Sequence, residues 1–337
     1  MNMNLLQFAN QTLRVPLAAL AQPPFHTLVE ALQAKLVDLG LLDPTIGGDI
    51  DTPFRPLRPG DGNFGPQTHA ALGHFCQLVG LPDELFFSPA LALRLHEATP
   101  DLLTPMHLDE SDSDSNEALL AKRILRFMLE EKKYWVARAP GMFNIVYLEG
   151  CTERGVTNDD MQNRWNDRRM VIDIANDQPR IRINHAATTE PGDKSIEKYP
   201  KTIAHIAFGQ YKAWTLGDHY FDPKRKQPAL RQDNANTLRV HRGKRREGSK
   251  VHLDGLHINQ HSTYGSTPDE VKNWSAGCLV GQNTSLHKEF ISLMDSDWRY
   301  KRLSKSGAPY FFITTVLDGE EFNRFKNEWI FRSGATR

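Results

Sequence analysis

The chain contains few cysteines and no excess of charge of either sign. Of its 337 residues only three are cysteine, Cys76, Cys151 and Cys278, and no two of them form a C-x-x-C pair. An odd number of widely separated cysteines argues against a disulfide scaffold and against a cysteine-rich zinc module. The 41 basic and 41 acidic residues cancel, so the net charge gives no general reason to expect nucleic acid or an anionic membrane as a partner.

Long apolar runs are also missing. No stretch of about 18 apolar residues is present to span a bilayer. The first 25 residues lack the basic start and the continuous apolar run of a signal peptide. We therefore expect synthesis in the cytoplasm without a general export signal, and no membrane span.

One local exception to the balanced charge is the stretch from Arg239 to Lys250. It holds six basic residues and His241 against one acidic residue. Two interpretations stay open, a solvated loop or hairpin tip and a patch that meets an anionic polymer.

Two helices are predicted in the first 85 residues. Residues 25–42 carry leucines at helical spacing, with Gly40 as a stop. A passage rich in proline and glycine follows, and then Pro66 opens a second helix at a first-turn position. The apolar face of this second helix consists of Ala71, Leu72, Phe75 and Leu78.

This pair of segments resembles the small three-helix peptidoglycan-binding domain. The matching residues are Leu32, Gln33, Leu36, Leu39, Gly40, Asp61, Gly62, Phe64, Gly65, Pro66, Thr68, Ala71, Phe75, Gly80 and Leu81. The chain departs from the family at Cys76, where glutamine is usual, and in a long insertion between the helices. The resemblance implies a peptidoglycan-binding domain over residues 20–105, with Phe64 and Thr68 in substrate binding. A helical docking module without a ligand is the alternative.

Residues 106–117 contain an acidic, polar run and are interpreted as a linker. Residues 118–335 form the second predicted domain. It begins with an amphipathic helix over residues 118–136 and continues as short runs rich in Val, Ile, Tyr, Phe and Thr, which are typical of strands. A helix is expected over residues 285–294. The predicted fold class is α+β multidomain, with a small all-α N-terminal module and a mostly β C-terminal catalytic domain.

The stretch from residue 255 to residue 290 carries the chemistry. A strand is predicted to end at His261, and Ser275, Ala276 and Gly277 form a small turn before Cys278. A thiol becomes a nucleophile when a base removes its proton, and acyl transfer also needs donors for the oxyanion. His261 is suited to be the base, and Gly277 lets the backbone turn sharply and bring its N–H to a substrate carbonyl.

This stretch is similar to the active-site signature of the L,D-transpeptidase catalytic domain, in which a strand-borne His precedes an S-H-G-C turn. His261, Ser262 and Thr263 match the first part and residues 275–279 the second, with 13 residues between His261 and Ser275. The resemblance implies Cys278 as nucleophile, His261 as base, and Ser275 and Gly277 in the turn. In the family the cysteine attacks a stem-peptide carbonyl and backbone amides around it form the oxyanion hole. Ala276 replaces the family's second His, and Val280 replaces an Arg or Asn.

Several alternatives stay open. His257, four residues earlier, would share a strand face with His261 and is a second candidate for the base. Trp274 is interpreted as a core residue or, with Ser262, as part of substrate binding. Cys76 and Cys151 are expected to be buried and inert. The remaining polar residues, Asp193, His219 and the turn over residues 188–192, are interpreted as loop residues.

The expected function is a peptidoglycan-active cysteine enzyme that forms an acyl-enzyme with the stem peptide and then transfers it to an amine or to water. No cofactor and no metal are expected. The alternatives are a non-catalytic peptidoglycan-binding protein of a phage or secretion assembly, and a zinc peptidase built on His241, His252 and Asp254, although no HExxH spacing is present. Action in the periplasm or cell wall would need non-classical delivery, with secretion machinery and an immunity protein as expected partners.

Overall fold

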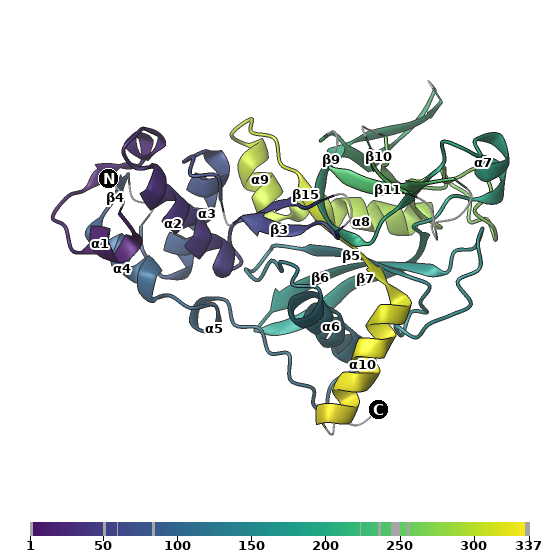
Figure 1. Cartoon of the computed structure of the whole chain (residues 1–337), viewed down its shortest axis with the longest axis horizontal. Coiled ribbons are helices and arrows are strands. Elements are labelled where there is room, and N and C mark those ends of the chain that lie inside the picture. The colour runs from purple at the N-terminus through teal and green to yellow at the C-terminus, as the bar shows by residue number, and fades with distance from the viewer. Residues whose placement is uncertain are drawn as a thin grey trace.

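The computed structural model describes residues 3–49, 52–58, 60–82, 85–222, 224–234, 237–243, 250–254 and 257–333. A group of short helices forms the N-terminal end of the molecule, and a closed barrel with helices around it forms the rest (Figure 1). The predicted α+β class is confirmed. No helix among the described residues is long and apolar enough to cross a membrane.

The N-terminal part is helical, as expected. Both predicted helices are present, and the leucines that predicted the first one are at most 2% exposed. Gly65 is the N-cap of the second helix and Pro66 its first residue. Two short antiparallel ladders, β1–β4 and β2–β3, lie among the helices. The elements are α1 (Leu5–Ala9), β1 (Val15–Pro16), η1 (Leu17–Ala21), α2 (His26–Asp38), β2 (Thr45–Gly47), β3 (Arg55–Arg58), α3 (Pro66–Leu78), β4 (Phe86–Phe87), α4 (Pro89–Glu97) and α5 (Pro100–Leu103).

The segment expected to be a linker lies against the next helix, α6 (Asn116–Arg126). Lys122 is 3% exposed, and its Nζ donates to Asp114 Oδ2 at 2.8 Å. Glu110 accepts from Arg123 Nε at 2.8 Å, and Ser115 caps the helix. The acidic side chains therefore pair with the basic side of α6. The helix predicted over residues 118–136 continues as one π-turn, η2 (Phe127–Glu131), and ends there.

Eight strands close the barrel in the order β10-β13-β14-β7-β6-β5-β15-β9. Two neighbouring pairs, β13–β14 and β15–β5, are parallel, and the others are antiparallel. A separate three-stranded sheet has the order β12-β11-β8. The barrel strands are β5 (Asn144–Glu149), β6 (Asp167–Ala175), β7 (Gln178–Thr188), β9 (Gly209–Asp222), β10 (Arg225–Gln232), β13 (Gln260–Ser262), β14 (Leu279–Gly281) and β15 (Phe312–Asp318); the others are β8 (Ala204–Ile206), β11 (Leu238–Arg242) and β12 (Val251–Asp254).

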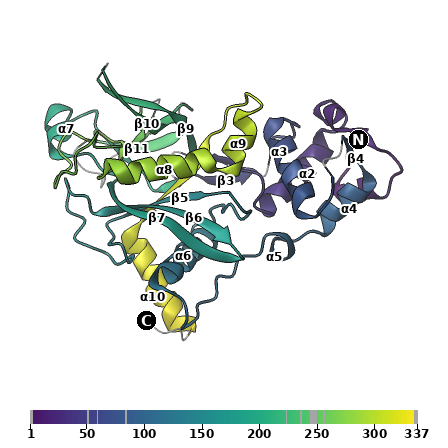
Figure 2. The ribbon, with the colours of Figure 1, turned by 180° about the vertical axis from the view of Figure 1, so that it is seen from behind.

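Successive side chains of a barrel strand pack in two different hydrophobic clusters, because neighbouring residues of a strand point to opposite faces. Ile145 and Tyr147 of β5 belong to a cluster that includes residues of α8 (Thr284–Ser296) and α9 (Trp298–Ser304). Val146 and Leu148 belong to a second cluster with α6 and α10 (Gly319–Ser333). Both views show α6 and α10 next to each other below the strands, and Figure 2 shows α8 lengthwise on the barrel. A short helix, α7 (Asp193–Lys198), lies at the far end.

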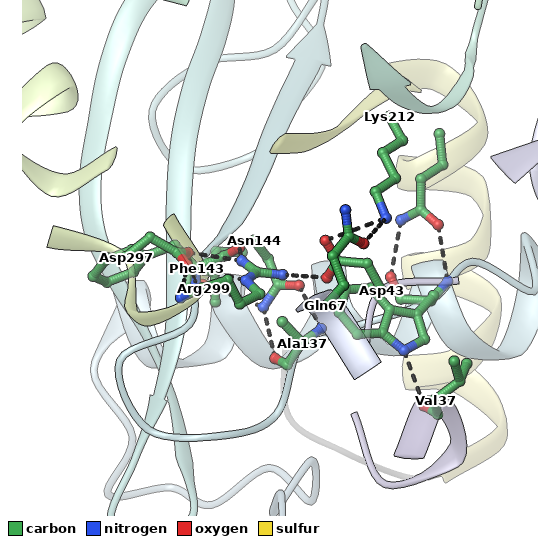
Figure 3. A network of polar contacts seen from close by, with 12 residues as sticks. Val37, Asp43, Gln67, Ala137, Phe143, Asn144, Lys212, Asp297 and Arg299 are labelled. Atoms are coloured by element: carbon green, nitrogen blue, oxygen red, sulfur yellow. Dashed lines mark hydrogen bonds and ion pairs between the residues drawn. The ribbon is translucent and has the colours of Figure 1, made fainter. Parts of the chain in front are cut away.

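A buried polar network joins the N-terminal helices to the barrel (Figure 3). Arg299 of α9 donates to Asp43 Oδ1 at 2.8 Å and to Asp297 Oδ2 at 2.7 Å. Lys212 of β9 lies 3.7 Å from Asp43 Oδ2 and donates to Gln67 of α3. Burial alone would raise the pKa of Asp43, but the charges of Arg299 and Lys212 hold it below its ordinary value. Asp43 is thus an ionised side chain between two cations.

Replacing Asp43 by alanine is expected to lower the free energy of unfolding by about 3 kcal/mol, because a buried guanidinium loses one of its two carboxylate partners. Urea denaturation measures this change. The control is Asp218→Ala, which removes a half-buried carboxylate that pairs with the exposed Lys226 at 2.8 Å. A pair at the surface contributes about 0–1 kcal/mol. Equal losses from the two variants would contradict the assignment of the network to stability.

Candidate active site

Cys278 lies directly before β14, opposite the start of β13. These strands are parallel, and His261 is paired with Val280. Paired residues of a parallel ladder point to the same face, and so do residues two apart in one strand. Cys278 Sγ accepts the backbone N–H of Asn259 at 3.4 Å and donates to the carbonyl oxygen of His257 at 3.4 Å. The register therefore brings the thiol and the His261 imidazole to one face of the barrel wall.

The turn before the cysteine is held by its own serine. Ser275 Oγ donates to the carbonyl of Cys278 at 2.8 Å and accepts the N–H of Gly277 at 3.1 Å. Gly277 has φ +126°, and a Cβ there would lie 2.8 Å from both Cβ and the carbonyl oxygen of Ala204. Only glycine fits this position. The expectation that the Gly277 N–H meets a substrate carbonyl is wrong for this conformation, because Ser275 accepts that N–H.

The His261 ring is fixed in one tautomer. The ring is 2% exposed, and its Nδ1 lies 2.9 Å from the carbonyl oxygen of Ser262. A carbonyl only accepts, so Nδ1 carries the hydrogen and Nε2 has the free lone pair that a base needs. Gln227 of β10 holds the same peptide, since its amide donates to Ser262 O at 2.9 Å and accepts from Ser262 Oγ at 2.8 Å. Burial is the main cause that lowers the pKa of His261 well below its usual value.

Two residues that the sequence analysis did not assign to the site lie beside His261. His219 stacks on it, with ring centroids 4.0 Å apart and planes at 11°. The Asn259 side-chain amide is 2.9 Å from His219 Nδ1. The interpretation of His219 as a loop residue is wrong, because it lies in β9. Little in the sequence indicates this role beyond a histidine in an aromatic-rich strand. The reason is that only the order of strands in the barrel brings β9 near β13.

Aromatic rings continue from this pair. Tyr264 donates its hydroxyl to the carbonyl of His219 at 2.7 Å, and its ring lies 6.4 Å from that of His261. Trp274 stacks on Tyr264, with centroids 6.3 Å apart and planes at 15°, and is half-buried. These four rings form a continuous wall from the base to the residue before Ser275.

Arg169 of β6 crosses behind β13 and β14. It is fully buried, and Nη2 donates to the carbonyls of His261 at 3.0 Å and Leu279 at 3.4 Å. Its Nε donates to Tyr147 and its Nη1 to His287 Nδ1. A Cβ on Gly281 would lie 3.0 Å from Nη1, so the guanidinium lies directly against the β14 backbone.

The other predicted residues are placed as follows. His257 is exposed with φ +88° and precedes β13, so the expectation that it shares a strand face with His261 is wrong. Ser262 is fully buried and supports His261 instead of reaching a substrate. Thr68 is 3% exposed and accepts from Gln33, whereas Phe64 is half-buried. The remaining cysteines, Cys76 and Cys151, are buried, and Asp193 begins α7.

The described part of the chain contains no group of three or more His, Cys, Asp or Glu residues that could hold a metal ion. His241 lies in β11 and His252 in β12, next to each other in the ladder, with Val240 paired to His252 and His241 to Val251. The side chain of Asp254 and residues 244–249 of the basic stretch lie outside the described residues.

Comparisons with known proteins give one structural neighbour. No family model matches the chain, and no curated protein matches it. Among solved structures, a fused Zn-dependent amidase/peptidase/peptidoglycan-binding domain-containing protein from Clostridium acetobutylicum ATCC 824 is similar over 86% of this chain and 94% of its own, with 13% identity and a TM-score of 0.30. A superposition with so low a score carries no argument about the fold or the chemistry of this chain.

Gly277→Ala is expected to lower the free energy of unfolding by roughly 2–3 kcal/mol, since it adds a collision with Ala204 to the strain of a positive φ. Gly243→Ala is the matched control, because Gly243 also has a positive φ (+107°) but a Cβ there would meet nothing within 4 Å. It should lose about 1 kcal/mol. Thermal and urea denaturation compare the two, and a smaller loss at Gly277 would contradict the close approach.

Stability is expected to fall as the pH falls below about 6.5, where unfolded histidines bind protons. Burial lowers the pKa of His74, His185 and His219 to about 4 and that of His287 to about 3, and His261 shifts the same way. The unfolded chain then binds more protons than the native chain, so the free energy of unfolding drops by about 1.4 kcal/mol per pH unit for each such group. Urea denaturation between pH 6 and pH 4.5 measures the slope. His74→Gln should reduce that slope by the contribution of one histidine. An unchanged slope would contradict the lowered pKa of His74.

Proposed function

We propose that this protein is a peptidoglycan-active cysteine enzyme that forms an acyl-enzyme on Cys278 with the stem peptide. The observation that carries the proposal is the β13–β14 register, which brings Cys278 and His261 to one face. The hydrogen bond from His261 Nδ1 to Ser262 leaves Nε2 able to accept a proton. Together they supply the nucleophile and the base that acyl transfer from a peptide requires.

In the first step Cys278 Sγ attacks the carbonyl carbon, the S–C bond forms, and the π electrons move to the oxygen. His261 Nε2 takes the thiol proton. Collapse of the tetrahedral intermediate breaks the C–N bond, and the proton passes to the departing amine. Water or an amine of a second peptide then attacks the thioester and gives up a proton to His261 Nε2, the C–S bond breaks, and the Cys278 thiolate takes the proton back. The N–H of Asn259, which already contacts Sγ, is a donor in place for the thiolate.

The N-terminal helices supply the proposed attachment to the wall polymer. A cleft of about 420 Å³ lies at the start of α3 and is lined by residues of the matched motif, including Asp61 and Pro66, together with Gln67 of α3 and Lys212 of β9. This size falls in the range of about 300–1,000 Å³ that is usual for ligand sites. Thr68 lines this cleft, but its hydroxyl accepts from Gln33, so we assign contact with the ligand to Gln67 and Lys212 instead. Phe64 is not among the residues that line the cleft.

A non-catalytic wall-binding protein of a phage or secretion assembly is the second candidate. The observation that favours it is the turn itself, where Ala276 takes the place of a polar residue and Val280 is buried and apolar. Both candidates bind peptidoglycan, but only the first turns it over. Loss of turnover on adding a chelator would instead favour the zinc peptidase.

Cys278→Ala is expected to abolish turnover of purified muropeptides, and His261→Gln to lower it by at least about a hundredfold, because the base is lost. Mass spectrometry of the muropeptides measures both, and the intact protein mass reports the acyl-enzyme. The control is Cys151→Ala, which removes a thiol that is 1% exposed and whose pKa burial raises to about 12.

Three results are decisive. Turnover that survives in Cys278→Ala would refute the cysteine mechanism. Binding to insoluble peptidoglycan without any turnover by the unmodified protein would favour the non-catalytic candidate. An acyl group on Cys278, absent from Cys278→Ala and present in Cys151→Ala, would support the enzyme.

A further inference from the structure

His219 has a defined tautomer, and the side chain of Asn259 defines it. Asn259 Oδ1 accepts the backbone N–H of Gln232 at 3.0 Å. The amide orientation is therefore fixed, and it is the NH₂ group that lies 2.9 Å from His219 Nδ1. Nδ1 must accept this hydrogen bond, so Nε2 of His219 carries the ring hydrogen. In both rings the partner of Nδ1 decides the state of Nε2. His219 Nδ1 accepts, so its Nε2 is a donor, whereas His261 Nδ1 donates, so its Nε2 is an acceptor.

That Nε2–H is available. Among the hydrogen bonds of the described residues, His219 contributes its Nδ1 and its backbone carbonyl, and none uses Nε2. The residue is half-buried, so it is not fully enclosed by the protein. Its place beside the nucleophile is fixed through Asn259, whose side chain holds His219 while its backbone N–H contacts Cys278 Sγ.

The turn before Cys278 offers fewer oxyanion donors than the sequence predicts. Ala276 has no polar side chain, and the Gly277 N–H is taken by Ser275 Oγ. Each preorganised hydrogen-bond donor aimed at the oxyanion stabilises the tetrahedral intermediate. A neutral imidazole N–H next to the base is a suitable replacement.

His219 also stays neutral when the base becomes charged. Nδ1 of His219 accepts from Asn259 and its Nε2 carries the ring hydrogen, so the ring has no free lone pair for the proton that His261 receives. Burial also lowers the pKa of His219 to about 4. The two rings are stacked at 4.0 Å, and the imidazolium formed on His261 then meets a neutral aromatic face instead of a second positive charge.

We propose that His219 is a second catalytic imidazole, which donates its Nε2–H to the carbonyl oxygen of the scissile bond as Cys278 attacks. This inference rests on the acyl-enzyme chemistry proposed above. No proton leaves His219. Its hydrogen bond shortens as negative charge gathers on the oxygen and lengthens again when the C–N bond breaks and the carbonyl re-forms.

The test compares two reactions of the same thiol in full-length His219→Phe, which keeps a ring of similar shape for stacking but has no N–H. Acylation by p-nitrophenyl acetate passes through an oxyanion, whereas alkylation by iodoacetamide does not. We expect acylation of Cys278 to slow by about a hundredfold and alkylation to stay within about twofold of the unmodified protein. With muropeptides, kcat should fall by a similar factor while KM changes little.

His219→Gln returns an N–H donor to the position and is expected to recover at least about tenfold of the lost acylation rate. His252→Phe, at an exposed position of β12, is the control and should change neither rate. Thermal denaturation confirms that each variant is folded. If acylation by His219→Phe stays within about threefold of the unmodified protein, or if acylation and alkylation fall together, the inference is refuted.

The ester assay separates this inference from the proposed function. If Cys278 is acylated by the ester but no muropeptide is turned over, the peptidoglycan proposal fails and the comparison of His219 variants still decides the role of this ring. If the unmodified protein is not acylated by the ester or by muropeptides, both are refuted.

Discussion

The arrangement of the site depends on one buried cation, Arg169. The strand that carries His261 and the strand that follows Cys278 are only three residues long each and share three register pairs, so their ladder alone does not hold the site rigidly. Arg169 ties them from behind, with hydrogen bonds to one carbonyl of each strand. Among the described residues no carboxylate pairs with it, and its desolvation is offset by these hydrogen bonds and by the ring of Phe290, 4.5 Å from the guanidinium carbon. The small size of Gly281 makes this close contact possible.

The same cation shapes the electrostatics of the imidazoles around it. After burial, the charge of Arg169 is among the causes that lower the pKa of His261, His287 and His185. His287 accepts from Arg169 at Nδ1 and donates from Nε2 to the carbonyl of Pro228, so it is neutral and fixed in one tautomer. The charge of Arg169 disfavours a second positive charge on His261, and the neutral rings next to it supply no negative charge to offset this. A proton taken up by His261 is therefore released readily. A base that releases its proton readily suits the collapse of the first tetrahedral intermediate, in which the departing amine must be protonated.

The part of the site that the sequence predicts is the part encoded locally. The Ser-Ala-Gly turn and the strand around His261 could be recognised, because a glycine before the cysteine and the alternating residues before His261 are local signs in the sequence. The groups that complete the site come from far along the chain. Arg169 lies 92 residues before His261, and His219 lies 40 residues before Asn259. Only the order of strands in the closed barrel brings them together, and no periodicity within one segment records that order. The wrong expectation that the Gly277 N–H is available has a local cause instead, because the acceptor is the side chain of Ser275, two residues earlier.

The N-terminal helices are packed against the barrel and are not a separate module on a flexible linker. Trp135 donates its indole N–H to the carbonyl of Val37, and its side chain belongs to the same core cluster as the leucines of α2. Asp43 is buried between Arg299 and Lys212, so separating the two parts would leave a guanidinium without one partner and an ammonium without its carboxylate. That cost in free energy holds the N-terminal helices in one orientation relative to the barrel.

A polymer held in the cleft at α3 would therefore meet the barrel in a set direction. The segment over residues 106–117 does not act as a flexible linker, because Glu110 and Asp114 are paired with α6. Binding and reaction would then be coupled through a rigid body, without the averaging over orientations that a flexible linker gives.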